Sequence, residues 1–469
     1  MQEALAAEVL FLIGAAIVFS FIGAAILRRL GIPQTLGFMI VGIILGLLGI
    51  ANEDLVHSLR LIVSLALGLI GYNIGHELRS DELKGRIGKL SFIVLVEASA
   101  AFLVVSVFTY AVVQQWHIAL ILGALASATA PAATADVVWE HGTQGELSSS
   151  LMYVLAADDI AAVILTNSAI AYALWVFIPN TTTLLEVLLV PIMKIGIAAI
   201  LGAGFAGVFL RFVNRERDRG KLLELELGMV IFLIGMCLVL GVSEIFACIM
   251  FGFFVAHYID EDKEPIPVLV ERIMSPIVMI FFVLVGARMA HLLTVASILF
   301  PILITAALYL TGRTVAKYFG ARIGATIVVE SEKMKKYLGS SLFCQAGVAL
   351  GLSFIVEETF VALGGEIAAV GELVLGVVAV STIVLEAVGP MAVKYSLRKA
   401  GELPEGETYL EPHEITTIAR CGIDFINCKQ IELLCKDCPH CEEIENGEPE
   451  VETEREAKID DPSKEWFAD

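Results

Sequence analysis

Charged residues are scarce in this chain. Asp, Glu, Lys and Arg make up 17% of its 469 residues, whereas 57% are hydrophobic, and the mean hydropathy is +0.82. A soluble globular domain typically has about 25% charged residues, so this composition excludes that class. Apolar runs long enough to cross a bilayer as helices recur as far as Lys394. The sequence therefore predicts an all-α polytopic membrane protein.

Basic residues are missing from some of the loops between apolar runs, such as 114–116 and 179–183. They gather in four others: 28–29, 79–89, 211–221 and 333–336. Lys and Arg collect in cytoplasmic loops, and thirteen crossings place all four basic loops on that side. This predicts a multi-pass protein of the cytoplasmic membrane with its N-terminus outside. The predicted spans are 9–27, 34–50, 55–74, 90–113, 117–138, 148–175, 184–212, 223–240, 243–258, 267–287, 292–319, 339–356 and 367–393.

The negative charge is concentrated in the last part of the chain. Residues 401–469 contain 20 Asp and Glu against 6 Lys and Arg, which accounts for −14 of the net charge of −20. We therefore divide the chain into a transmembrane domain, 1–398, and an acidic, cysteine-rich cytoplasmic tail, 399–469. An acidic tail argues against nucleic acid or anionic lipid as its partner.

Five of the eight cysteines lie in this tail with the spacing C-x6-C-x6-C-x2-C-x2-C. Cysteines two residues apart can present two thiolates to one metal, and four thiolates suit zinc. We predict a zinc site, with an iron–sulfur site, redox-sensing thiols or unliganded cysteines in a disordered tail as alternatives. Transport itself requires no cofactor. The cysteines are Cys421, Cys428, Cys435, Cys438 and Cys441.

Two spans contain patches of small and polar residues that interrupt a helix. The first, 127–136, includes Thr129 and Pro131; the second, 340–347, includes Cys344 and Gln345. Proline removes a backbone hydrogen bond, which a membrane tolerates only beside protein or a water-filled cavity. Such segments also form kinked, closely packed helix interfaces. Because the two breaks occupy matching places in the two halves, they predict an inverted repeat with a site at its midplane.

Two adjacent carboxylates, Asp158 and Asp159, lie inside the apolar span 148–175. Acids at that depth are costly and typically functional, the alternative being a structural ion pair within the bundle. Thr166 and Asn167 continue the face of Asp159 at offsets of seven and eight. Carboxylates, hydroxyls and freed carbonyls are the oxygen ligands of a hard cation. We therefore expect a proton and a cation to compete for Asp159.

The acids require a counter-charge. Arg313 is the deepest basic residue of any predicted span, and we assign it to Asp158, whereas Lys317 is expected to snorkel toward the cytoplasmic end of its helix. Arg288 is expected at the external interface. Glu97 and Glu244 are isolated acids within spans and read equally well as proton relays or as hydrogen-bonded packing residues.

Taken together, several segments resemble the cation:proton antiporter superfamily, on its branch with bacterial sodium/proton antiporters and glutathione-gated potassium efflux proteins. The matching stretches appear in the family's order, from about Leu10 to Val393. They are 36–42, 71–78, 128–138, 158–159, 281–286, 312–313 and 345–347.

The resemblance implies two crossing broken helices within a core domain, roughly 90–176 and 292–394, and a separate dimerisation domain that makes the protein a homodimer. It implies that Asp159 binds the cation and the proton, that Asp158 pairs with the basic residue, and that Thr129 lies at the crossover. Relatives with two acids usually carry Lys where we align Arg313, and arginine is effectively always protonated. On that alignment, this chain has no lysine at the position that could release a proton, which bears on the number of protons exchanged per transport cycle.

These features predict a secondary active antiporter, not an enzyme, that exchanges Na⁺, or else K⁺ or Li⁺, for H⁺ by alternating access. The alternative is a gated potassium efflux protein or channel controlled by the cysteine-rich tail, although the chain lacks a carbonyl filter sequence of the Thr-Val-Gly-Tyr-Gly kind. A third interpretation is a sensor with a vestigial transporter core, in which the acids are dispensable.

Overall fold

The computed structural model describes residues 2–28, 33–51, 53–78, 85–177, 184–213, 219–259, 265–294 and 296–403. Every secondary structure element in these ranges is a helix. The first eight are α1 (Gln2–Arg28), α2 (Gln34–Leu47), α3 (Glu53–Ser58), α4 (Arg60–Glu77), α5 (Ile87–Val113), α6 (Trp116–Ala126), α7 (Pro131–Glu140) and α8 (Glu146–Phe177). The others are α9 (Leu184–Val213), α10 (Arg219–Leu240), α11 (Glu244–Tyr258), α12 (Pro265–Thr294), α13 (Ala296–Ile327), α14 (Glu332–Ser341), α15 (Gly347–Val361) and α16 (Gly365–Ala400).

The chain divides into two units, Met1–Gly406 and Glu407–Asp469. The second unit contains the five cysteines predicted to bind zinc, and it lies outside the described residues. The boundary we drew at residue 398 and the metal in the tail both stay predictions.

Nine segments in the described part of the chain are long and apolar enough to cross a membrane, one of them formed by α6 and α7 together, and α2 and α11 are shorter apolar helices. Their outer faces carry large apolar side chains: Phe21 is 71% exposed and Val239 is 86% exposed. In water such surfaces would be costly, whereas in a bilayer they contact lipid chains. The chain is therefore an integral membrane protein, and the number of thirteen crossings stays a prediction.

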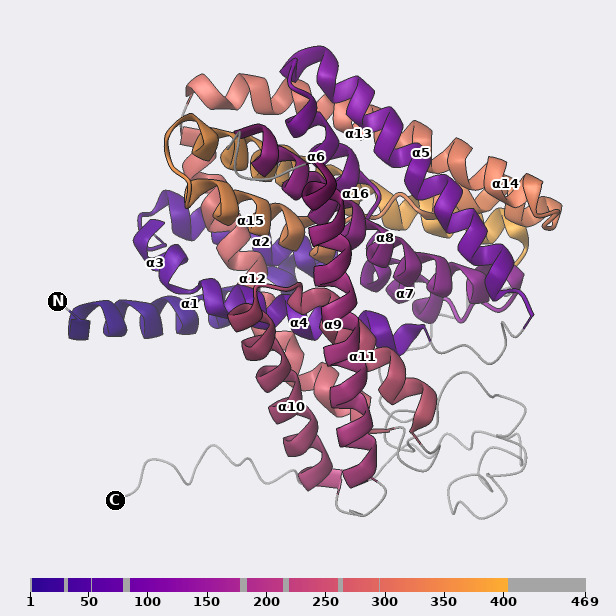
Figure 1. Ribbon diagram of the computed structural model, residues 1–469, viewed down its shortest axis with the longest axis horizontal. Helices are drawn as coiled ribbons and strands as arrows, with labels where there is room; N and C mark the ends of the chain where they lie inside the picture. Colours follow the sequence, from indigo (N-terminus) through magenta and orange to yellow (C-terminus); the bar gives the residue numbers. More distant parts are fainter. Residues whose placement is uncertain are drawn as a thin grey trace, which may run out of the picture. The chain divides into compact units, whose positions relative to one another are not determined.

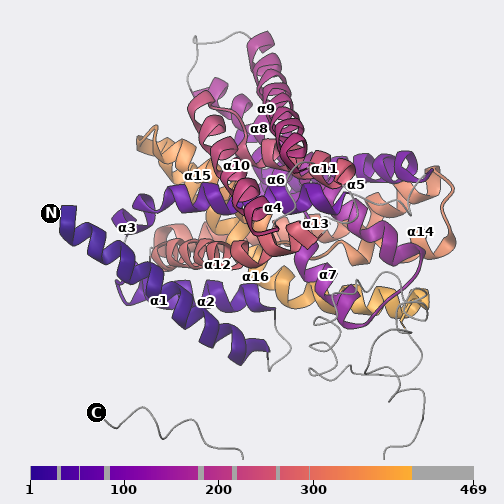
Figure 2. The ribbon, with the colours of Figure 1, turned by 90° about the horizontal axis from the view of Figure 1, so that it is seen from below.

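The helices pack as two groups. The core group comprises α5–α8 and α13–α16, and α5 lies along α13 (Figure 1). The scaffold group comprises α1–α4 and α9–α12, in which α2 lies along α12 and α4 along α11 (Figure 2). Each half of the core group has the same order: one continuous helix, one interrupted helix, and a second continuous helix. This is the order that the two sequence breaks predicted.

Glycines allow the paired helices of the scaffold group to touch backbone to backbone. A Cβ atom on Gly42 of α2 would lie 2.1 Å from the Val283 carbonyl oxygen of α12, and one on Gly286 of α12 would lie 2.1 Å from the Met39 oxygen of α2. Small residues at membrane helix interfaces permit this approach, where van der Waals packing replaces the hydrophobic effect. The scaffold group is thereby held by contacts that a methyl group would break.

We expect Gly42→Ala to lower the free energy of unfolding by about 1–3 kcal/mol, because α2 and α12 must separate to admit the new Cβ. Gly235→Ala is the matched control, because Gly235 lies in α10 and a Cβ there meets nothing within 4 Å. That substitution removes only the helix penalty of glycine and should be neutral or mildly stabilising. Thermal unfolding in detergent measures both variants, and equal unfolding temperatures would contradict the packing argument.

The first turn of α8, the helix that carries the paired acids, is held by Glu402. The Glu402 carboxylate accepts hydrogen bonds from the backbone N atoms of Leu147 and Ser148, both at 2.8 Å, and from Ser148 Oγ at 2.7 Å. The first amides of a helix have no partner within the helix, and an acid stabilises the positive end of its dipole. Glu402 therefore fixes the start of α8 relative to the end of α16.

Candidate functional site

The two interrupted helices meet at their breaks. Residues 127–130 separate α6 from α7, and residues 342–346 separate α14 from α15. Pro131 is the first residue of α7, a position where its missing N–H costs no helical hydrogen bond. The backbone N of Ala130 donates to the Cys344 carbonyl oxygen at 3.1 Å. We call this meeting point the crossover.

Gln345 ties the second break to the first interrupted helix. Its Nε2 atom donates to the Leu125 carbonyl oxygen at 2.9 Å and lies 2.8 Å from the Tyr309 hydroxyl. The side chain is fully buried, so these contacts satisfy an amide group that would otherwise be buried without hydrogen-bond partners. Gln345 thus fastens α6, α13 and the second break together.

Arg313 of α13 binds backbone carbonyls at the crossover. Its Nη2 donates to the oxygens of Ala128 at 2.7 Å and Cys344 at 3.1 Å, and its Nη1 donates to that of Phe343 at 2.8 Å. The breaks free these carbonyls, and the ends of α6 and α14 carry partial negative charge. The guanidinium donates hydrogen bonds to both ends at once. Our assignment of Arg313 to Asp158 is therefore wrong.

Lys317, one turn after Arg313, is the residue that pairs with Asp158. Its Nζ lies 2.8 Å from Asp158 Oδ2 and 2.9 Å from Glu97 Oε2, and all three side chains are 0% exposed. It also donates to the Ser127 carbonyl. The expected snorkelling of Lys317 is wrong, because carboxylates of α5 and α8 give it partners inside the bundle.

The sequence pattern did not indicate Lys317 as the partner of Asp158 and left the role of Glu97 open. The available signal was the spacing of four residues between Arg313 and Lys317, which places both cations on one face of α13. Glu97 faces that side of α13 because Gly320 brings the two helices together, and a Cβ at Gly320 would lie 2.8 Å from Glu97 Cα.

Thr129, in the first break, contacts the paired acids. Its Oγ1 donates to Asp158 Oδ2 at 2.9 Å, and both side chains are buried. One oxygen of Asp158 therefore receives a hydroxyl and an ammonium group, which fixes the carboxylate in place. Asp158 therefore has a structural role in the site.

Asp159 differs from Asp158 in having no side-chain partner. It is 0% exposed, no side chain among the described residues donates a hydrogen bond to its carboxylate, and the Thr129 backbone is the polar group that acts on it. Asp158, Lys317 and Glu77 are the charged groups that act on it. Asp159 is the buried acid of the crossover whose oxygens are open to a ligand.

The polar face predicted beyond Asp159 is only partly available. Thr166 is fully buried, and its hydroxyl has no partner among the described residues. Asn167 instead donates its Nδ2 to the Val163 carbonyl oxygen of its own helix at 2.8 Å. Asn167 keeps only its amide oxygen free of that bond, and its role as a cation ligand stays a prediction.

Two ion pairs join the end of α15 in the core group to the scaffold group. Arg288 Nε of α12 lies 2.8 Å from Glu357 Oε1, and Arg60 Nη1 of α4 lies 3.4 Å from Glu358 Oε1. The first pair is largely buried and the second is half-exposed. These pairs tie adjacent residues of one helix to two different scaffold helices.

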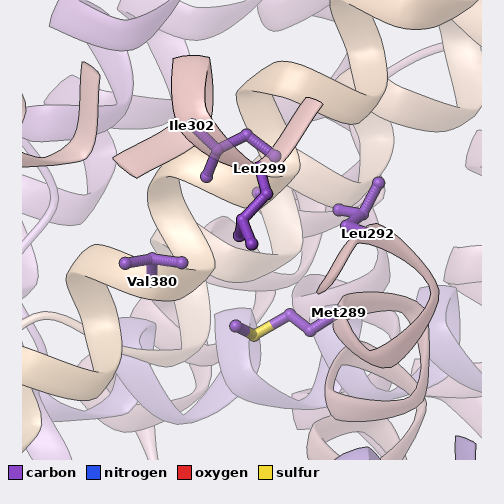
Figure 3. A pocket seen from close by; sticks show the side chains of 6 residues that line it. Met289, Leu292, Leu299, Ile302 and Val380 are labelled. Atoms are coloured by element: carbon purple, nitrogen blue, oxygen red, sulfur yellow. The ribbon is translucent and has the colours of Figure 1, made fainter. Parts of the chain in front are cut away.

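The apolar pocket shown in Figure 3 is not a candidate for the ion site. It has a volume of about 10 Å³, and its six lining residues, among them Met289, Leu292 and Val380, offer no side-chain oxygen. A cation in such a space would lose its hydration without gaining ligands. The crossover is the place that supplies oxygens.

The described residues contain no group of three or more His, Cys, Asp and Glu side chains suited to a metal ion. Three cysteines in these ranges, Cys237, Cys248 and Cys344, are buried and free. The predicted zinc ligands all lie beyond the described residues.

A family model described as "Sodium/hydrogen exchanger, transmembrane" matches residues 16–394. This match spans the described helices from α1 to α16. Among curated proteins no significant match was found.

The fold is similar to that of a sodium proton antiporter of known structure. The structure of MjNhaP1 from Methanocaldococcus jannaschii at pH 8 aligns with a TM-score of 0.73 and 17% sequence identity, covering 86% of this chain and 100% of that one. A three-dimensional electron microscopy map of the same antiporter aligns with a TM-score of 0.65 and 19% identity, covering 84% and 98%. At these identities the similarity establishes the fold.

Proposed function

Since the chain belongs to the sodium/hydrogen exchanger family, we propose that it exchanges Na⁺, or alternatively K⁺ or Li⁺, for H⁺ across the cytoplasmic membrane, with Asp159 as the shared binding site. The observation that carries this proposal is the buried Asp159 carboxylate, which has no side-chain partner among the described residues. The N-terminus outside, the cytoplasmic tail and the homodimer are parts of the same proposal.

A count of formal charges supports Asp159 as the site. The crossover buries three carboxyl groups, Asp158, Asp159 and Glu97, and two cations, Arg313 and Lys317. One negative charge is therefore in excess. An uncompensated charge in a low-dielectric interior is very costly. Either a proton or a monovalent cation on Asp159 balances the crossover, so the two ions compete and exchange.

The surroundings of Asp159 favour binding that is reversible. Asp158 is occupied by Lys317 and Thr129, so it holds the site's shape while Asp159 changes its ligand. Water and the Asp159 oxygens are the ligands available to a hard cation such as Na⁺, and the Thr166 hydroxyl lies two turns further along the same helix. Protonation of Asp159 removes the charge that attracts the cation, which then leaves.

Alternating access is proposed as a movement of the core group against the scaffold group. The site lies wholly on core helices, and the core group is internally fastened by Gln345, Arg313 and Lys317. Rigid elements of this kind move as one body. The bound ion would thus travel with α8. The seam, which is the contact surface between the core group and the scaffold group, would open toward one side of the membrane at a time.

Lys317 reopens the question of charge stoichiometry. A permanently charged arginine paired to Asp158 would have removed one source of protons, whereas a lysine can release its proton when its environment changes. Both electrogenic and electroneutral exchange are compatible with an Asp158–Lys317 pair.

We expect the purified protein in proteoliposomes to alkalinise the lumen when Na⁺ is added outside, because each Na⁺ that enters is exchanged for H⁺ that leaves. A trapped pH dye reports the change, with Na⁺, Li⁺ and K⁺ run in parallel. Potassium with valinomycin clamps the voltage, and an electrogenic exchanger runs faster under that clamp. Potassium flux without any H⁺ movement would contradict antiport and support the gated potassium efflux alternative.

A further inference from the structure

A second buried carboxyl group, Glu386 of α16, lies outside the crossover acids. Its side chain is 0% exposed. Its Oε2 accepts a hydrogen bond from Thr35 Oγ1 at 2.7 Å, while its Oε1 has no partner. No Lys, Arg or His in the described ranges forms an ion pair with it. Glu386 is therefore a buried acid without a counter-charge.

Glu386 lies beside the second break. One turn further along α16, Gly389 packs against Cys344, and a Cβ at Gly389 would lie 2.9 Å from Cys344 Cα. One turn earlier, Thr382 is fully buried with a hydroxyl that has no partner among the described residues. The titratable groups that interact with Glu386 are Asp136 of α7 and Cys344. Neither supplies positive charge.

The Thr35 hydrogen bond crosses the seam between the two helix groups. Thr35 is in the first turn of α2, which belongs to the scaffold group, and Glu386 belongs to the core group. While the helices touch, the carboxyl group is dry and must be neutral to avoid the cost of an unpaired buried charge. When the groups move apart, that hydrogen bond breaks and water reaches the carboxyl group.

We propose that Glu386 is a second proton-binding site, which takes up H⁺ when α2 and α16 close and releases it when they separate. Oε1 is the atom without a partner and therefore the place for the proton. This site would link proton binding to the position of the core group, whereas Asp159 links it to the cation. The proposal rests on the proposed antiport, because only a moving core group opens the seam.

Glu226 shows why burial alone does not make such a site. It is also 0% exposed and accepts a hydrogen bond from a hydroxyl group, that of Tyr72. However, Glu226 is on α10 and Tyr72 on α4, both in the scaffold group. Movement of the core group leaves that pair intact, so Glu226 is a matched control for Glu386.

The test is the pH profile of Na⁺-driven H⁺ exchange by the full chain in proteoliposomes, for the wild type, Glu386→Gln and Glu226→Gln. Glutamine mimics the protonated carboxyl group and keeps the Thr35 contact. We expect Glu386→Gln to retain exchange but to lose one titrating proton. On the acid side of its pH profile, the exchange rate of this variant should therefore change by a factor about tenfold smaller per pH unit than that of the wild type. Glu226→Gln should keep the wild-type profile.

A second variant distinguishes a titrating group from a structural one. Thr35→Val preserves the Glu386 carboxyl group but removes the donor that stabilises its ionised form, so the corresponding titration should move to higher pH. An unchanged profile in Glu386→Gln, or the same change in Glu226→Gln, overturns the proposal. Absence of exchange by the wild type would instead overturn the proposed antiport, and the two failures are thus separate results.

Discussion

Replacement of Asp159 by asparagine should abolish cation-dependent H⁺ movement in proteoliposomes, to about a hundredth of the wild-type rate or less. Asparagine has nearly the same shape but neither binds a proton in this pH range nor attracts a cation. Because no side chain among the described residues pairs with Asp159, removing its charge also removes a buried acid that has no counter-charge of its own. Asp159→Asn should therefore unfold at the same temperature as the wild type or at a higher one.

That combination of lost transport and retained stability separates a functional carboxylate from a structural one. Ser168→Ala is the matched control on the same helix, because the Ser168 hydroxyl is exposed and donates only to the Ile164 carbonyl. It should transport normally. Exchange that survives in Asp159→Asn would remove Asp159 from the mechanism and favour the interpretation of a sensor with dispensable acids.

Replacement of Lys317 by methionine should have the opposite effect on stability. Methionine fills much of the lysine's volume but leaves the Asp158 and Glu97 carboxylates buried together without their cation. Removing one partner of a buried ion pair typically costs about 3–5 kcal/mol. We expect a large fall in the unfolding temperature in detergent, together with loss of exchange.

A second substitution tests whether the cost arises from the unpaired acids. Combining Lys317→Met with Glu97→Gln removes one of the two stranded charges, so the double variant should recover part of the stability lost by Lys317→Met alone. A double-mutant cycle isolates that coupling. Unfolding of Lys317→Met at the wild-type temperature, or strictly additive effects, would show that the ion pairs contribute little.

The breaks were predictable because their cause is local. Pro131 cannot donate a backbone hydrogen bond, and small residues around it leave room for a neighbouring chain. The same reasoning located the second break at Cys344 and Gln345. The paired acids were recognisable because placing carboxylates in an apolar membrane span costs free energy. Each of these signals lies within a few residues of the sequence.

The pairing of charges was not predictable in the same way. Arg313 and Lys317 share a face of α13, and the sequence does not show which head group meets carbonyls and which meets carboxylates. The answer depends on the crossover, where segments more than 180 residues apart in the chain supply the oxygens around Arg313. The link between Thr35 and Glu386 spans 351 residues. Such contacts follow from the fold, not from local spacing.

The depth of Lys317 was misjudged for a related reason. Counting residues from the end of a span measures distance along one helix, and by that measure Lys317 lies near a surface. Depth within a bundle also depends on what covers the side chain, and here α5 and α8 cover it with two acids. A lysine near a helix end can therefore be more deeply buried than its position in the sequence indicates.

The ion pairs at the end of α15 restrict how that half-helix can turn. Adjacent helical residues point about 100° apart, and Glu357 and Glu358 are bonded to arginines of two different helices. Rotation of α15 about its own axis would move both carboxylates away from their arginines. The two ion pairs therefore favour one angular setting of the helix, chiefly through the buried Arg288–Glu357 pair, because the exposed Arg60–Glu358 pair contributes little.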